Sequence, residues 1–337
     1  MKRMTMVVLG LLMVEVIYGS TPLVTDIIKK REANGEERVN IDPDVTKEIQ
    51  NLRSSDPVKR GNAAIALGRM VPRAIPAITA LIERLDDTIA LKKTGIMPLI
   101  GNTAEEAAKA LINMGKPGIE SLTGVLQDKN IYIVKRMIAA EGLGHSNDPL
   151  AIEALISVLK DSSERTYQTF IWGNTCVRFE AAKSLGRIKG PRARNALIEA
   201  LSDEEIRRNA ALALGKIGDE IAKEALLKAA LGDQHIRYIA VDYVKNKQIV
   251  DLLLIDLKNE KWSIRADAAE ALGKTKDINS VEPLIESLKD KDFLVRRKAG
   301  EALQTIKGAE GDYLGEDPGK WQKWWKKNKD RLLKKSQ

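Results

Sequence analysis

The sequence is poor in the side chains that build disulfide, metal or histidine-based centres. Its 337 residues include one cysteine, Cys176, and two histidines, His145 and His235. A single cysteine cannot form an intramolecular disulfide, and two histidines leave little material for a metal site or a catalytic imidazole. The chain also lacks serine-nucleophile motifs, phosphate-binding loops and paired-cysteine spacings. A composition of 44% apolar and 30% charged residues is that of a globular protein, which excludes collagenous, disordered and multi-span membrane proteins.

The N-terminus has the layout of a secretory signal peptide. Lys2 and Arg3 precede an uncharged run over residues 4–14, and the small residue Gly19 follows. The run is too short for a bilayer span of about 20 residues. We therefore expect a signal peptide at residues 1–19 and an extracytoplasmic protein, periplasmic or secreted. An uncleaved N-terminal anchor and a cytosolic protein are the alternatives.

The net charge of +8 is concentrated at the C-terminus. Residues 316–337 hold eight Lys or Arg side chains against three acidic ones, a net charge of +5, and the other 315 residues share +3. A groove that follows a phosphate backbone would need basic residues spread along the body of the protein. No nucleic-acid partner is expected.

A leucine, usually followed by glycine, recurs through the chain at spacings of 28 to 44 residues, which is the range of a helical repeat. Small alanines precede it in a first helix, and larger aliphatic residues follow in a second helix. This pattern predicts an all-α, right-handed α-solenoid of about eight helix pairs over residues 52–308. A polar linker and a half-repeat are expected at residues 20–51. The register residues are Leu67, Leu111, Leu143, Leu185, Leu214, Val244, Leu272 and Leu303.

An arginine precedes the register residue by seven positions in every unit but the one at Ala104. In four units an aspartate stands four residues before this arginine, where it can cap the helix and form an i,i+4 ion pair. Such repetition predicts a structural ladder of charges between neighbouring units rather than a row of phosphate-binding groups. The arginines are Arg60, Arg136, Arg178, Arg207, Arg237, Arg265 and Arg296, and the aspartates are Asp56, Asp203, Asp233 and Asp292.

The segment VEPLIESLKDKDFLVRRKAGEAL, residues 281–303, resembles a unit of the HEAT-like repeat named after phycobilisome (PBS) lyases, and SDEEIRRNAALALGKIG is similar. The resemblance implies a HEAT-like fold. It leaves function open, because such repeats serve as scaffolds, lyase subunits, a metal-dependent hydroxylase and DNA glycosylases.

The enzymatic branches of this superfamily are poorly matched. Deoxyhypusine hydroxylase binds iron through units that read Val-Arg-His-Glu-Ala-Ala, and residues 177–182 here carry Phe179 where the histidine ligand should be. A bilin lyase would need a chromophore-binding face. Cys176 is a thiol acceptor only by residue type, and its neighbourhood predicts a small buried apolar residue. No cofactor, metal ion or catalytic residue is therefore expected.

The C-terminal segment, residues 309–337, predicts an amphipathic helix that begins at Asp317 and Pro318. We expect it to cap the open end of the solenoid. Peripheral contact with a membrane and docking onto a partner are the alternatives. The tryptophans on its apolar side are Trp321, Trp324 and Trp325.

Two long spacings mark insertions between a second helix and the next first helix. Both insertions are apolar, and insertions at equivalent points of a solenoid project from one edge. They are expected either to fold back over their own units or to line a binding site for a partner. The candidate binding residues are Ile96, Met97, Tyr167, Phe170 and Trp172.

The sequence thus favours a non-catalytic, exported scaffold that binds a protein partner through the solenoid surface. The alternative is an accessory subunit of a lyase or other modifying enzyme. Binding of nucleic acid ranks third.

Overall fold

The computed structural model consists of stacked helix pairs and a single small β-hairpin in the part of the chain that it describes. Contacts divide the chain into two compact units, residues 1–200 (unit 1) and 201–337 (unit 2). The described residues are 41–87, 103–163, 167–169, 173–308 and 314–335.

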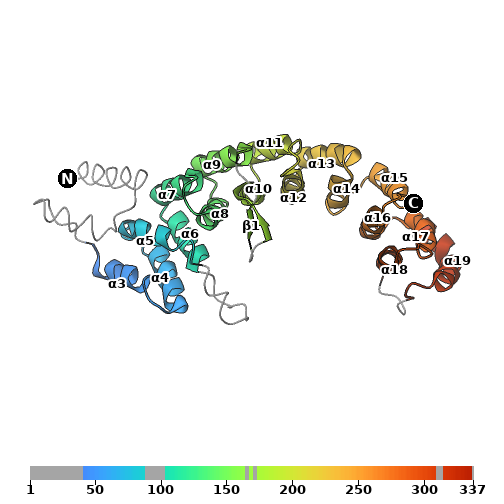
Figure 1. Cartoon of the computed structure of the whole chain (residues 1–337), viewed down its shortest axis with the longest axis horizontal. Helices are drawn as coiled ribbons and strands as arrows, with labels where there is room; N and C mark the ends of the chain where they lie inside the picture. The colour runs from blue at the N-terminus through green and yellow to red at the C-terminus, as the bar shows by residue number, and fades with distance from the viewer. Residues whose placement is uncertain (1–40, 88–102, 164–166, 170–172, 309–313, 336–337) are drawn as a thin grey trace, which may run out of the picture. The chain divides into compact units, whose positions relative to one another are not determined.

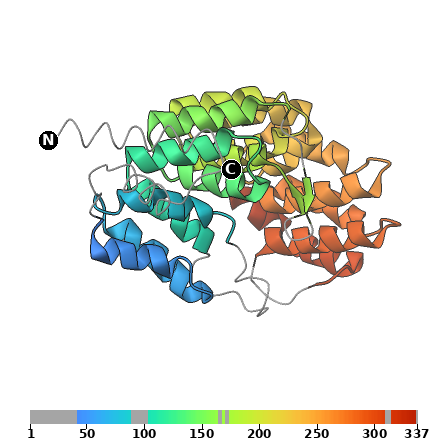
Figure 2. The same cartoon turned by 60° about the vertical axis from the view of Figure 1, so that its left-hand side comes forward.

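In unit 1 the described residues begin with α3 (Pro43–Asn51), and four helix pairs follow. In Figures 1 and 2 the first helices of these pairs form one layer and the second helices form another. The pairs are α4 (Pro57–Arg69) with the 3₁₀ turn η1 (Ile75–Ala77) and α5 (Ile78–Glu83), α6 (Thr103–Asn113) with α7 (Lys116–Gln127), α8 (Ile133–Leu143) with α9 (Pro149–Lys160), and α10 (Val177–Ile188) with α11 (Pro191–Ala200).

Unit 2 contains four further pairs. The first helices α12, α14, α16 and α18 pack one on the next, while α13 packs on α15 and α17 packs on α19. The pairs are α12 (Arg207–Ile217) with α13 (Glu220–Gly232), α14 (Gln234–Ala240) with α15 (Lys247–Asp256), α16 (Trp262–Thr275) with the 3₁₀ turn η3 (Ile278–Ser280) and α17 (Val281–Ser287), and α18 (Phe293–Lys307) with α19 (Pro318–Lys335). The prediction of an all-α fold built from helix pairs is confirmed.

Aspartate and proline mark where many of these helices begin. The Asp56 side chain accepts a hydrogen bond from the Val58 N–H at 2.9 Å, and Pro57 occupies the first helical position, where no N–H is needed. Asp148 caps α9 in the same way through the Leu150 N–H. Because each cap satisfies a backbone donor at a fixed place in the sequence, the helix starts are set locally.

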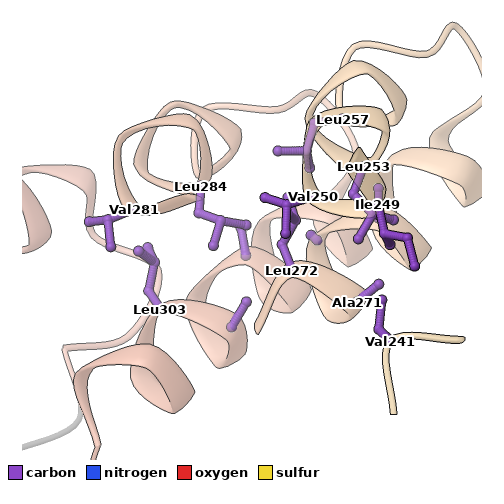
Figure 3. Close-up of a cluster of buried hydrophobic side chains, with 14 of the residues drawn as sticks. Val241, Ile249, Val250, Leu253, Leu257, Ala271, Leu272, Val281, Leu284 and Leu303 are labelled. Atoms are coloured by element: carbon purple, nitrogen blue, oxygen red, sulfur yellow. The ribbon is translucent and has the colours of Figure 1, made fainter. Parts of the chain in front are cut away.

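The register leucines lie between the two layers and form the core of each unit. In unit 2, Leu272 and Leu303 of the first helices meet Leu253 and Leu284 of the second helices (Figure 3). All four side chains are fully buried. Burial of a leucine side chain stabilises the fold by about 1.5 to 3 kcal/mol, so this layer of aliphatic contacts holds each pair together.

The glycine after the register leucine lets successive first helices approach closely. A Cβ atom placed on Gly273 of α16 would lie 2.7 Å from the Cα atom of Ala302 in α18. That separation is far below van der Waals contact. The recurring Leu-Gly pair is therefore a packing device of the first-helix layer.

The insertion between α9 and α10 contains a β-hairpin that the sequence pattern did not predict. Strands β1 (Tyr167–Thr169) and β2 (Gly173–Thr175) pair antiparallel, with Tyr167 opposite Thr175. Figure 1 draws β1 on the side of α10 that faces away from α9 and α11.

No helix among the described residues is long and apolar enough to cross a membrane.

Candidate protein-binding surfaces

The repeated arginines join each helix pair to its neighbour. Six of the seven guanidinium groups donate hydrogen bonds to backbone carbonyls at the end of the preceding helix or just after it. Arg136 donates to the Leu126 carbonyl at 2.9 Å, and Arg178 donates to the Leu159 carbonyl at 3.0 Å. Helix ends leave carbonyl groups unpaired, so the arginines satisfy acceptors that would otherwise be buried without a donor. The other four are Arg60, Arg237, Arg265 and Arg296.

Four of the seven arginines donate a hydrogen bond to a carboxylate that follows them by 19 to 27 positions. The acid lies at the end of the second helix of the same pair or in the turn after it. Arg60, Arg237 and Arg265 therefore connect the end of the helix that precedes their pair with the end of the second helix of their own pair. The pairs are Arg60 with Asp87, Arg207 with Asp233, Arg237 with Asp256, and Arg265 with Asp290.

The predicted i,i+4 ion pairs are wrong for Asp56, Asp233 and Asp292. These carboxylates accept hydrogen bonds from backbone N–H groups in the first turn of α4, α14 and α18. The Oδ1 atom of each accepts from the helix terminus, and Oδ2 of Asp233 accepts from Arg207. The arginine four residues later donates to the backbone carbonyls described above. Asp203 accepts from the Glu205 N–H, in the turn before α12.

The C-terminal helix α19 packs its tryptophans on unit 2. Trp321 is fully buried and donates through Nε1 to the Gly315 carbonyl at 2.8 Å, and Trp325 is nearly buried and donates to Glu282 Oε1 at 2.8 Å. Trp324 stacks beside Trp325. An interfacial membrane helix would need its apolar side free, so the arrangement of α19 disfavours peripheral membrane contact through the tryptophans.

A row of ion pairs covers the first-helix face of unit 1. Glu141 of α8 lies 3.8 Å from both Lys183 and Arg187 of α10, and Lys183 also pairs with Glu180 at 3.0 Å. Burial raises the pKa of Glu180 and the nearby Glu141 charge raises it further, against the attraction of Lys183. These charges are largely matched within the protein.

The histidines and the cysteine are dispersed. His145 follows α8 in a turn, where its Nε2 lies 3.3 Å from Arg187 Nη1, and His235 is the second residue of α14. Burial, together with the charge of Arg187, lowers the pKa of His145. Cys176 is fully buried at the start of α10, which confirms its prediction as a small core residue. Within the described residues, no cluster of three His, Cys, Asp or Glu side chains could hold a metal ion.

Large apolar side chains are exposed mainly at one edge of each unit, where first helices begin and second helices end. Six of the nine exposed ones among the described residues lie there, and the set includes three aromatic rings with exposed fractions of 49 to 62%. We call these residues the apolar edge. Its members are Val58 and Tyr132 in unit 1 and Leu231, Ile255, Trp262 and Phe293 in unit 2.

The sequence pattern does not single out Tyr132, Trp262 or Phe293 as binding residues. A signal was present, because Trp262 and Phe293 each stand three residues before a bridging arginine. Of the predicted binding residues, Ile96, Met97, Phe170 and Trp172 lie outside the described residues. Tyr167 is the first residue of β1.

Comparison with known proteins finds repeat families along the chain. A model of HEAT repeats matches residues 173–245 and 234–304, and a model of the PBS lyase HEAT-like repeat matches residues 135–161.

Two phycocyanobilin lyase alpha subunits are similar in sequence. The one from Picosynechococcus sp. is 37% identical over 70 residues, which cover 19% of this chain and 26% of that protein. The one from Synechococcus elongatus is 36% identical over 118 residues, which cover 34% and 41%. The chain thus matches less than half the length of these relatives.

Two solved structures also resemble the chain. The complex of CpcE and CpcF of phycocyanin lyase from Nostoc sp. PCC7120 has 21% identity and a TM-score of 0.34, covering 82% of this chain and 94% of that chain. Human deoxyhypusine hydroxylase in complex with glycerol has 24% identity and a TM-score of 0.30, covering 78% and 96%.

Proposed function

We propose, from the premise that this chain is a HEAT-repeat protein of the PBS lyase HEAT-like type, that it is a protein-binding subunit of a modifying enzyme. The observation that carries the proposal is the position of its exposed aromatic rings. Tyr132, Trp262 and Phe293 all stand at the start of a first helix, although nothing in the packing of a helix pair requires an aromatic residue there. Exposed aromatic side chains, here one in unit 1 and two in unit 2, are typical of protein interfaces.

The side chains that repeat from unit to unit already form contacts within the protein. The arginines bind carbonyls and carboxylates of the protein itself, and the register leucines are buried in the core. This supports a role in which the repeat supplies a rigid stack and the variable edge residues supply recognition. The chain resembles lyase alpha subunits, and from this resemblance we infer that such a subunit works in a modifying enzyme.

Site-directed photo-crosslinking tests the binding edge. A photoreactive phenylalanine analogue placed at Tyr132, Trp262 or Phe293 should form one discrete adduct with a partner in the native cells. Leu150 and Ile221 are matched controls, because they are exposed apolar residues at the start of second helices, on the opposite edge. Adducts of equal yield from both edges, or from neither, would refute the proposal.

A titration with phycocyanobilin tests the link to lyases. If the chain shares the substrate class named for its relatives, a saturable change in visible absorption is expected when the chain and its crosslinked partner are present together. If the partner binds and the absorption does not change, the chain is a scaffold for an enzyme that carries out another modification.

The extracytoplasmic location remains a proposal based on Lys2, Arg3 and residues 4–14, which lie outside the described residues. An intact Met1 on protein recovered from the cytosol would refute it.

A further inference from the structure

The C-terminal helix α19 carries its lysines on the side that the fold leaves uncovered. Trp321 is fully buried and Trp325 is 8% exposed, whereas five lysines on the other side of the helix are exposed. In Figure 1, α19 is the last helix of unit 2, and no other described helix of this unit lies on its outer side. The exposed lysines are Lys320, Lys323, Lys326, Lys327 and Lys334.

Four of these lysines form one stripe along the helix. Each follows the previous one by three, four or seven positions, and such spacings bring side chains to the same side of an α-helix. At a rise of about 1.5 Å per residue, the stripe is about 21 Å long. We call it the lysine face, and it consists of Lys320, Lys323, Lys327 and Lys334.

The carboxylates next to the lysine face are few, and the fold uses most of them. Asp317 accepts two backbone N–H groups at the start of α19, at 2.8 and 3.2 Å, and Glu316 lies 3.9 Å from Arg296. Asp330 is the only acidic residue within the helix. In the part of the chain that the structure describes, no lysine of the face forms an ion pair. Its positive charge is therefore available to a partner.

The fold does not require these charges. Like charges three or four positions apart destabilise a helix, and the lysine face contains such neighbours. Elsewhere in unit 2 the two signs are matched, as in α13, where Lys223 lies 2.8 Å from Glu220. Even within α19, Lys329 pairs with Glu282 of α17 at 2.8 Å. The unmatched lysines therefore indicate a contact outside the protein.

The composition of the lysine face favours a diffuse anionic surface over a protein. The core of a protein interface is poor in lysine and rich in aromatic residues and arginine. The lysine face has no apolar residue of its own, because the three tryptophans of α19 pack against the core of unit 2. Four to eight basic residues on an amphipathic helix are instead typical of contact with anionic lipid headgroups.

The rest of unit 2 offers no path for a nucleic-acid backbone. Residues 201–315 contain 19 Lys or Arg side chains and 21 Asp or Glu side chains, a net charge of −2. A bound strand would need basic residues along its whole course. Arginine, which binds phosphate through two parallel hydrogen bonds, is also absent from the lysine face, and lysine acts there as a point charge.

We propose that the lysine face of α19 binds the surface of an anionic phospholipid bilayer, with its ammonium groups against the headgroup phosphates. The tryptophans stay in the core of unit 2, so the helix rests on the headgroups without inserting into the acyl chains. This contact uses other residues than the apolar edge and does not rest on the proposed function.

Co-sedimentation of the full chain with lipid vesicles tests this contact. One set of vesicles contains phosphatidylglycerol and phosphatidylcholine in equal parts, and the other contains phosphatidylcholine alone. We expect binding to the anionic set only, and a loss of about tenfold or more when the salt concentration is raised to about 0.5 M. Residues 4–14 are the same in every variant below, so any binding through them appears on both sets.

Variants then locate the contact on the protein. Lys323→Gln with Lys327→Gln should lower the partition coefficient about tenfold or more, because each lysine near an anionic surface contributes about fivefold. Lys323→Arg with Lys327→Arg keeps the charge and should bind as the wild type does. The matched control is Lys216→Gln with Lys228→Gln, which removes the same charge from exposed lysines of α12 and α13. Circular dichroism establishes that each variant is folded.

The remaining outcomes overturn the proposal. If the control pair weakens binding as much as the pair in α19, only net charge matters and the assigned surface is wrong. Binding that is equal on both sets of vesicles, or that resists salt, contradicts an electrostatic contact with headgroups. Duplex DNA and a polyglutamate peptide serve as competitors at the same concentration of negative charge as the lipid. If either displaces the chain from the vesicles, the partner is a nucleic acid or an acidic protein instead. If no vesicle binds, the proposal fails and the protein-binding role of the apolar edge is unaffected.

Discussion

Arg265 and Asp290 face each other through two parallel hydrogen bonds, 2.7 Å from Nε to Oδ2 and 2.8 Å from Nη2 to Oδ1. The remaining guanidinium nitrogen, Nη1, donates to the carbonyls of Asn259 and Glu260 at 2.8 and 2.9 Å. One nearly buried side chain therefore holds the end of α15 and the end of α17 to the start of α16.

Arg265→Ala should lower the free energy of unfolding by about 3 kcal/mol or more, because it removes two of the donors to the Asp290 carboxylate and the guanidinium donor to two carbonyls. Chemical denaturation measures this loss. Arg297→Ala is the matched control, since Arg297 is exposed and lies 3.7 Å from Glu301, and its removal should cost less than about 1 kcal/mol. Equal losses in the two variants would contradict the structural role of the arginine network.

Asp233 caps α14 and also pairs with Arg207 at 2.9 Å. Burial alone would raise the pKa of Asp233, but the hydrogen bonds from Arg207 and from the N–H groups of Ile236 and His235 hold it below its usual value. Asp233→Ala should therefore cost about 2 kcal/mol, and Asp233→Asn, which can still cap, should cost less. Asp203→Ala is the comparison, and we expect a smaller loss of about 1 kcal/mol. A midpoint of denaturation lower for Asp203→Ala than for Asp233→Ala would reverse this order.

The sequence predicts helices, helix pairs and the core well because their signals are local and repeat. Leucine at the register position, glycine after it and aspartate at the cap each act within one unit, and Leu67 and Asp56 occupy the predicted places. The partners of the arginines are harder to predict, because Asp87 and Asp290 lie a whole helix pair further along the chain. An i,i+4 aspartate was the nearest acid in sequence, but its oxygens serve the helix terminus.

The apolar edge could not be found from hydrophobicity alone. Phe293 begins a helix in which Val295 and Leu303 are buried, and only the packing shows that its own ring is exposed. The amphipathic C-terminal helix α19 was easier to predict, because Trp321 and Trp325 are one turn apart and most of the lysines lie on the opposite side.

Gly273 permits the contact of α16 with α18, and Gly124 in α7 has open space around it. Gly273→Ala should destabilise unit 2 by about 1 to 3 kcal/mol, since a new methyl group would lie 2.7 Å from the Cα atom of Ala302. Gly124→Ala should stabilise the protein by about 0.5 to 1 kcal/mol, because alanine favours the helix and meets nothing within 4 Å. Thermal denaturation of the two variants compares the same chemical change at the two sites. If both variants lose stability, the close approach of α16 and α18 is not the reason that position 273 requires glycine.

The helix α19 covers the core of unit 2 with Trp321 and Trp325. Trp321→Ala should lower the free energy of unfolding by about 3 to 5 kcal/mol, and deletion of residues 317–337 should expose apolar surface and cause aggregation. The control is Lys320→Gln with Lys323→Gln on the exposed side of the same helix, which should leave the thermal midpoint nearly unchanged. Light scattering follows the aggregation. A truncated protein that stays monomeric and equally stable would favour a docking role for this helix.

The carboxyl groups of Glu180 and Glu270 respond to pH in opposite senses. Burial raises the pKa of Glu180 above 4.5 in the folded protein, whereas the hydrogen bond from Lys298 lowers the pKa of Glu270 below 4.5. A raised pKa means that the folded state disfavours the ionised carboxylate, so this group destabilises the fold once the pH rises through its folded pKa. Glu180→Gln should therefore stabilise the protein at pH 7, and the gain should disappear below about pH 4.5.

Glu270→Gln is the matched control with the opposite sign. Its ionised form is favoured in the folded state, so the variant should be less stable than the wild type at pH 7, and the difference should shrink as the pH falls through the lowered pKa of Glu270. Thermal midpoints of the wild type and both variants between pH 3 and pH 8 give the two curves. If Glu180→Gln is destabilising at pH 7, then Lys183 outweighs burial at this position, and the ion pair of Glu180 with Lys183, 3.0 Å long, stabilises the stack.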